Sequence, residues 1–260
     1  MRETLSTKKP FVITAAIGLV VIAALLVYGI LVTPARQPYR DALAQYKNVD
    51  TALARTSVSL NTTTASDDEF AKNIDAVKSA FTSLKKENEA LSKKEVLTNG
   101  EGKGLYDAYD KKLQAYMTYN ANVIASIQKV RPVLHACSVD MGAVKADAEG
   151  ATLMHTCAAK MQAATDVPDA DYKQMTEGFA KSYAELATIL DEMAALPDPK
   201  GADKARYDEL NQTRTQVVSD FSQISNTFSK NVQETRQQIL TTNTAKALQD
   251  YLTNKSRIFA

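Results

Sequence analysis

Two short stretches of the chain carry side chains that could bind a metal ion or form a covalent link. Residues 133–137 read VLHAC and residues 153–157 read LMHTC, so each stretch holds a histidine and a cysteine two positions apart. The 260-residue chain has two histidines and two cysteines, and all four lie here: His135, Cys137, His155 and Cys157. Imidazole and thiolate groups are common ligands of zinc and copper, and two thiols can also be oxidised to a disulfide.

A disulfide between Cys137 and Cys157 is the favoured interpretation. Cysteines outside the cytoplasm tend to be oxidised, and each of these two is the only candidate partner for the other. The bond would close a loop of about 20 residues and would stabilise the fold by roughly 3 kcal/mol in the chain-entropy model. The two histidines would then lie at the surface or at a helix end.

A metal site made of all four side chains is the alternative. Residues i and i+2 of a helix point about 200° apart, so His135 and Cys137 could share one ion only where the backbone leaves helical geometry. Spacings usual for structural zinc, such as C-x2-C, are absent. Met141, Met154 and Met161 would suit a soft ion such as Cu(I), yet methionine is also a common core residue. We therefore expect no cofactor.

Where this window lies depends on the N-terminal segment. Residues 11–32 read FVITAAIGLVVIAALLVYGILV and contain no charge. A helix of this length, at ~1.5 Å per residue, crosses the ~30 Å hydrocarbon core of a bilayer. We expect a single transmembrane signal anchor that contacts the lipid bilayer through residues 11–32.

The anchor determines the predicted domain organisation and location. Residues 1–10 would form a short cytoplasmic tail and residues 33–260 an extracytoplasmic domain, because long domains are translocated largely regardless of charge. Basic residues are balanced on the two sides of the segment and do not decide the orientation. Cleavage after Ala35 is the alternative, since small residues stand at 33 and 35. The expected location is the cell membrane, with one span and the N-terminus in the cytoplasm.

The spacing of apolar residues predicts an all-α protein. Apolar side chains recur every three or four residues, the period of an amphipathic helix, over residues 39–60, 70–91, 106–134, 172–196 and 207–239. Glycine is scarce, at 9 of 260 residues, which also favours helices. Narrow stripes and short connections predict an elongated antiparallel helical bundle with coiled-coil-like packing.

Local signals predict several helix boundaries. Ser66 and Glu69 match a capping box that begins the second helix, and residues 98–104, TNGEGKG, should end it. Asp169 should cap the fourth helix. Residues 241–244, TTNT, should interrupt the last one.

The third helix and the His/Cys window carry further breaking signals. Pro132 should kink or end the third helix, and Gly142 and Gly150 predict two short helices in the window. If consecutive helices alternate in direction, the disulfide-stapled segment, residues 137–157, lies at the membrane-distal tip.

Composition and motifs argue against several functions. The net charge of +1 is not that of a nucleic-acid binder, which normally carries a basic patch. No nucleophilic-serine, zinc-protease or phosphate-binding motif is present, so we expect no enzyme. In layout alone, a membrane helix followed by long antiparallel helices resembles the outer sensing modules of bacterial chemoreceptors.

Three functional hypotheses follow. The first is a membrane-anchored extracytoplasmic scaffold or protein-interaction module of the cell envelope, with a protein partner at the membrane-distal tip. The second is a ligand-binding sensor, or an accessory subunit of a membrane complex, with a pocket between helices lined by Tyr and Phe. The third is a metal-handling protein that uses the two His-x-Cys pairs. A fully packed core would favour the first, and a cavity of roughly several hundred Å³ among aromatic side chains the second.

Overall fold

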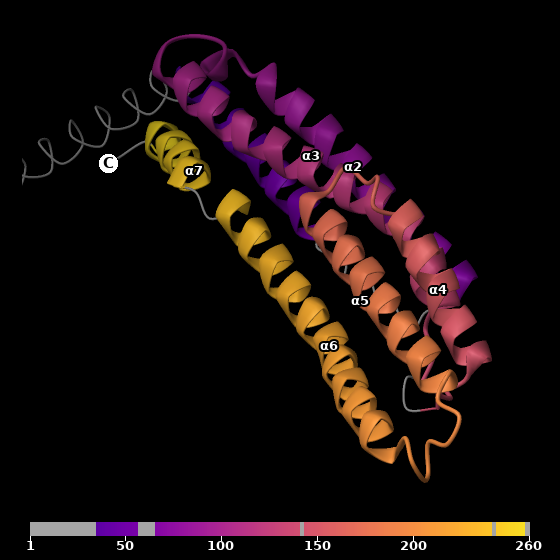
Figure 1. The fold of residues 1–260 in the computed structure, drawn as a ribbon. Coiled ribbons are helices and arrows are strands. Elements are labelled where there is room, and N and C mark those ends of the chain that lie inside the picture. Colours follow the sequence, from indigo (N-terminus) through magenta and orange to yellow (C-terminus); the bar gives the residue numbers. More distant parts are fainter. Residues whose placement is uncertain (1–34, 57–65, 141–142, 241–242, 258–260) are drawn as a thin grey trace, which may run out of the picture. The chain divides into compact units, whose positions relative to one another are not determined.

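The computed structural model describes residues 35–56, 66–140, 143–240 and 243–257, and these residues form helices joined by short connections (Figure 1). No strand occurs within these ranges, so the all-α prediction is confirmed. A first helix covers residues 35–55. The elements after it are α2 (Asp67–Ser92), η1 (Glu95–Leu97), α3 (Gly100–Ala136), α4 (Ala148–Ala163), α5 (Ala170–Ala194), α6 (Lys204–Leu240) and α7 (Asn243–Ser256).

The predicted membrane anchor, residues 11–32, lies outside the described residues and stays a prediction. Over the ranges that the structure does describe, none of the helices combines the length and the apolar character that a membrane crossing requires.

The chain divides into two compact units. The first unit comprises Met1–Ser57, Ser79–Lys111 and Asn243–Ala260, and the second comprises Val58–Lys78 and Lys112–Thr242. Helices α2 and α3 therefore each contribute one part of their length to each unit. The His/Cys window belongs entirely to the second unit.

Side-chain caps begin three of the helices, two of them at positions predicted from the sequence. The backbone N–H of Glu69 donates to the Ser66 hydroxyl at 3.3 Å, and that of Tyr172 donates to the Asp169 carboxylate at 3.0 Å. The third cap, Asp147, accepts from the N–H of Gly150 at 2.9 Å. Each cap pairs a donor that the first helical turn cannot pair internally.

The prediction for residues 98–104 is wrong in part. Helix α2 ends earlier, at Ser92, and Gly100 begins α3 with a φ of 55° instead of continuing a loop. A Cβ on Gly102 would collide with the carbonyl oxygen of Val96, so this glycine permits close packing of the α3 start on η1. Gly100 and Gly102 therefore serve a tight entry into α3.

Two other helix ends were predicted at the wrong place. Pro132 does not end α3, since the helix continues to Ala136, and the alternative of a kink at Pro132 stays a prediction. Gly150 lies in the first turn of the single helix α4, where the Asp147 cap holds its N–H. A Cβ on Gly150 would collide with the carbonyl oxygen of Lys145, so the residue is needed for a close approach of the preceding loop. The break predicted at 241–244 agrees with the start of α7 at Asn243, while Gly142 lies outside the described residues.

Tyrosines join the helices of the first unit. The rings of Tyr46 and Tyr109 lie 5.7 Å apart, and the Tyr46 hydroxyl donates to the carbonyl oxygen of Ala245 at 3.2 Å. These contacts connect the 35–55 helix to α3 and α7. Burial raises the pKa of Tyr46 to about 12, so its hydroxyl stays protonated and remains a donor at neutral pH.

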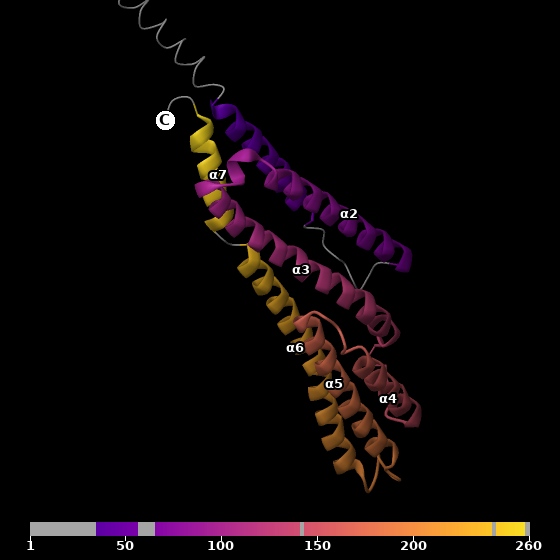
Figure 2. The same cartoon turned by 90° about the horizontal axis from the view of Figure 1, so that it is seen from above.

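Helix α5 is the centre of the second unit and lies between α4 and α6 (Figures 1 and 2). Twelve of its 25 residues are buried, and the helix packs against both α4 and α6. Helix α6 runs antiparallel to it. Tyr172 near the start of α5 packs on Phe228 with ring centroids 4.7 Å apart, whereas Glu192 near its end pairs with Arg206 at 2.5 Å.

The α5–α6 contact is narrow. A Cβ on Gly178 would lie 3.2 Å from the side chain of Ile224, so the two backbones approach closely at this point. Phe221, Ile224 and Phe228 of α6 are nevertheless only half-buried. Space is therefore left along both sides of the contact.

Candidate functional site

The structure brings Cys137 and Cys157 together in the geometry of a disulfide. Their Cα atoms lie 5.7 Å apart, within the ~4.4–6.8 Å range of protein disulfides. Cys137 directly follows α3 and Cys157 lies in α4, and both side chains are buried. The pairing expected from the sequence fits this arrangement, and it links the end of α3 to α4.

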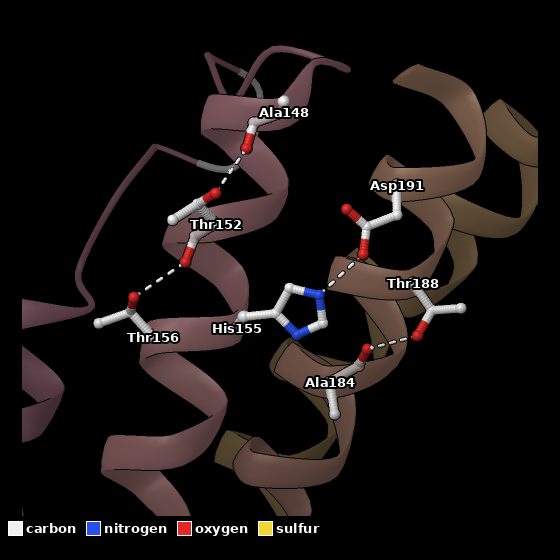
Figure 3. A network of polar contacts seen from close by, with 7 residues as sticks. All are labelled: Ala148, Thr152, His155, Thr156, Ala184, Thr188 and Asp191. Atoms are coloured by element: carbon white, nitrogen blue, oxygen red, sulfur yellow. Dashed lines mark hydrogen bonds and ion pairs between the residues drawn. The ribbon is translucent and has the colours of Figure 1, made fainter. Parts of the chain in front are cut away.

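The two histidines do not converge on the cysteines. His155 extends from α4 towards α5, where its Nε2 lies 2.8 Å from Oδ2 of Asp191 (Figure 3). Both side chains of this pair are more than half exposed, so the contact contributes at most about 1 kcal/mol. His135 is exposed near the end of α3. Both histidines are thus surface residues, as expected.

The arrangement does not support the metal-site alternative. Over the described part of the chain, which includes all four window residues, no three His, Cys, Asp or Glu side chains are grouped so that they could hold an ion. Met154 and Met161 are buried core residues of α4, and Met141 lies outside the described residues.

A second contact fixes the position of Cys137. The hydroxyl of Tyr183, on α5, donates a buried hydrogen bond to the carbonyl oxygen of Cys137 at 2.8 Å. Burial raises the pKa of Tyr183 to about 12, so the phenol keeps its proton. The end of α3 is therefore held both by α4, through the sulfur atoms, and by α5, through this hydroxyl.

Next to this junction lies a cavity of about 330 Å³, here called the aromatic cavity. Three helices and the residues that follow α3 form its walls. The lining residues are Ile127, Leu134, His135, Cys137, Ser138, Tyr172, Met175, Phe179, Tyr183, Ser225, Phe228 and Ser229.

The aromatic cavity has an apolar floor and a polar rim. The α5 side chains in its lining, Tyr172, Met175, Phe179 and Tyr183, are all buried. The exposed residues of the lining are His135, Ser138, Ser225 and Ser229. Ligand-binding pockets commonly combine such a floor with a few polar groups at the mouth.

Aromatic contacts fix the rings that form the floor. Tyr172 and Phe228 meet edge to face, and the rings of Tyr183 and Phe221 do the same with centroids 4.7 Å apart. Phe179 stacks on Phe221 with centroids 5.6 Å apart. Such pairs restrain ring rotation, so the cavity is largely pre-formed.

A larger hollow of about 490 Å³ between α5 and α6 has a different chemistry. Its lining includes Asp171, Lys181, Glu185 and Asp220. Burial raises the pKa of Asp171, and the neighbouring charge of Asp169 adds to the rise. The mixed charges are typical of a hydrated surface groove, and the aromatic cavity is therefore the stronger candidate for binding an organic ligand.

A third hollow lies on the disulfide-closed segment. It measures about 360 Å³ and is lined by Leu153 together with Val139, Ala143 and Val144. Leu153 is 37% exposed and is the large apolar side chain that stands out as exposed in the described part of the chain. Charged groups surround it, with Asp140, Lys145, Asp147 and Glu149 also in the lining.

Part of the aromatic cavity was foreseeable from the sequence. Tyr172, Phe179 and Phe228 belong to the predicted apolar stripes. Tyr183 was missed, although it stands four residues after Phe179 and continues the same helical spacing. The serines of α6 gave no local signal, because serine occurs at many exposed helix positions.

Comparison with known proteins adds no assignment. No protein-family profile matches this chain, no curated protein matches its sequence, and no solved structure matches its fold. Functional inference therefore depends on the chemistry of the hollows described above.

Proposed function

We propose that this chain is a non-enzymatic ligand-binding module of the cell envelope. It would be anchored in the membrane by residues 11–32 and would hold a small molecule in the aromatic cavity. The observation that supports this proposal is a pre-formed space of about 330 Å³ with a buried aromatic floor and a polar mouth. Ligand pockets span roughly 300–1,000 Å³, so the space suits a small ligand.

The lining chemistry favours binding over catalysis. General acid–base catalysis needs a titratable side chain within hydrogen-bond reach of the reacting group, commonly with a second group that orients it. His135 is the histidine in the lining, and no Asp, Glu, Lys or Arg lines the cavity among the residues that the structure describes. Apolar residues and serine hydroxyls make up most of the remainder.

The location in the envelope is supported by the apolar run at residues 11–32 and by the paired cysteines. Disulfides persist in oxidising compartments and are rare in the cytosol. Cys137 and Cys157 lie in disulfide geometry, which fits a domain outside the cytoplasm. Because both sulfur atoms would be used in that bond, we do not propose a metal-handling function.

We expect a small molecule to co-purify with the full-length protein and to be lost when the cavity is filled. Ser225→Leu adds apolar bulk at the exposed mouth of the cavity. Ser219→Leu is the matched control, because Ser219 is exposed on the same helix and lines none of the hollows described here. Mass spectrometry of compounds released by denaturation should detect the molecule in the unsubstituted protein and the control variant. An equal amount released from Ser225→Leu would contradict the proposal.

A protein-interaction function is the second candidate, and the exposure of Leu153 favours it. An exposed apolar side chain beside a hollow is a common feature of protein-binding surfaces. The surrounding charges, three acidic and one basic, would suit a partner that offers an apolar side chain flanked by basic groups.

Photocrosslinking in intact cells tests this second function. A photoreactive amino acid at position 153 should give a discrete adduct of higher mass, because the side chain points out of α4 beside the hollow. The same amino acid at Thr156, which is exposed on α4 but does not line the hollow, is the control. Identical adduct patterns from the two positions would show that the hollow does not bind a partner.

A further inference from the structure

We infer that the aromatic cavity selects an uncharged compound that contains an aromatic ring and a hydroxyl or N–H group. This inference rests on the proposed ligand-binding function and specifies the chemistry of its ligand. Four properties of the lining support it: its lack of charge, its aromatic rings, the orientation of its serine hydroxyls and its size.

The first property concerns charge. The described residues of the lining include no lysine or arginine that could neutralise an anion, and no carboxylate that could neutralise a cation. Taking an unpaired charge out of water costs several kcal/mol per ion in proteins, even after local relaxation. The buried floor therefore disfavours ligands of either charge. His135 is exposed at the rim and can remain hydrated.

The second property is the aromatic floor. Tyr172, Phe179, Tyr183 and Phe228 all line the cavity. Burial raises the pKa of both tyrosines, so neither phenol supplies a negative charge at neutral pH. Rings fixed in edge-to-face and stacked pairs offer faces and edges to a further ring, which gains about 0.5–1.5 kcal/mol per pair beyond area burial.

The third property is the state of the serine hydroxyls at the mouth. Ser225 donates its hydroxyl proton to the carbonyl oxygen of Phe221, and Ser229 donates to that of Ser225, both at 2.9 Å. A hydroxyl oxygen that has already donated can still accept a hydrogen bond. These two serines therefore offer acceptors, and a ligand hydroxyl or N–H group complements them.

The fourth property is size. A volume of about 330 Å³ lies at the small end of the roughly 300–1,000 Å³ range of ligand pockets. One fused ring pair with a short substituent fits such a space, whereas a lipid chain or a peptide would extend beyond it.

Three probes of nearly equal size test the inference on the full-length protein. Indole-3-acetamide is uncharged, indole-3-acetate is an anion and tryptamine is a cation at neutral pH, and all three carry the same ring N–H. The chain contains no tryptophan, so indole fluorescence reports on the probe alone. Its anisotropy rises when the probe binds, and a titration gives the dissociation constant.

We expect indole-3-acetamide to bind at least about tenfold more tightly than either charged probe. Ser225→Leu should weaken its binding by a similar factor, and Ser219→Leu should leave it unchanged. Equal or tighter binding of a charged probe would overturn the ligand class, as would the absence of binding by the uncharged probe. The probe titrations test the ligand class, and the co-purification experiment tests the proposed function separately. A charged compound that is released from the unsubstituted protein and from Ser219→Leu, but not from Ser225→Leu, would support ligand binding and refute this ligand class.

Discussion

Replacing Cys137 and Cys157 together by alanine should lower the free energy of unfolding by about 3 kcal/mol. The bond joins residues 20 positions apart, and its loss frees the intervening loop in the unfolded chain. The loop includes the connection between α3 and α4, which has no long apolar stripe of its own. Both positions are buried, and alanine, unlike serine, places no unpaired hydroxyl there. The measured loss therefore reports the missing link.

Denaturant unfolding of the full-length protein, followed by far-ultraviolet circular dichroism, measures this loss as a lower midpoint, with a steeper slope because the unlinked unfolded chain exposes more surface. Treating the unsubstituted protein with dithiothreitol provides an independent route to the same state. The reagent transfers two electrons and two protons, so the S–S bond becomes two thiols while dithiothreitol closes into its cyclic disulfide. The reduced protein and the double variant should then agree. A midpoint that does not move on reduction would contradict a stabilising disulfide.

Leu190→Ala should destabilise the second unit by about 3 kcal/mol, within the ~2–5 kcal/mol range of buried leucine truncations. Leu190 lies on α5, which packs against both α4 and α6, and its side chain is fully buried. The loss combines the transfer of apolar atoms from water with the cavity that rigid neighbours leave unfilled.

Leu153→Ala provides the matched comparison, since it removes the same atoms from an exposed position on α4. Surface substitutions of this kind usually change stability by less than about 0.5 kcal/mol. Both variants can be unfolded in urea under identical conditions. Similar midpoints for the two variants would show that α5 is not the centre of a packed core.

The helical character of the chain could be predicted because it depends on local spacing. Apolar residues at intervals of three and four identify the buried faces of α2, α3, α5 and α6, and short polar side chains identify the starts of α2 and α5. The cap at Asp169 is an example, since its carboxylate accepts the N–H of Tyr172 three residues later. Information of this kind lies within a few residues of the position concerned.

The errors occurred where a contact distant in sequence, or a backbone approach, overrode a local signal. Gly150 indicates a break when considered alone, yet its lack of a side chain allows the preceding loop to lie against α4. Pro132 removes one hydrogen bond from α3, but the helix extends to Ala136, directly before the buried Cys137. At Gly150, tertiary packing overrides a local signal for a break.

The candidate site could be predicted only in its separate parts. The aromatic stripe and the cysteine pair could each be recognised in the sequence. That the two lie next to each other in the fold could not be predicted. Whether Ser225 and Ser229 border a cavity depends on how α6 packs on α5, and Gly178 allows the Ile224 side chain to approach the α5 backbone closely. That spacing is a property of the assembled unit, so no window of the sequence contains it.

Cys137 pairs with Cys157 and also lines the aromatic cavity, and sharing this residue has a thermodynamic consequence. Two equilibria that share a structural element are linked, so any factor by which thiol formation changes ligand affinity is also the factor by which an occupied cavity shifts the thiol–disulfide balance. The fraction of protein molecules that hold a ligand would then depend on how oxidising the surroundings are. Equally, a compound that fills the space would protect, or expose, the one covalent crosslink in the described chain.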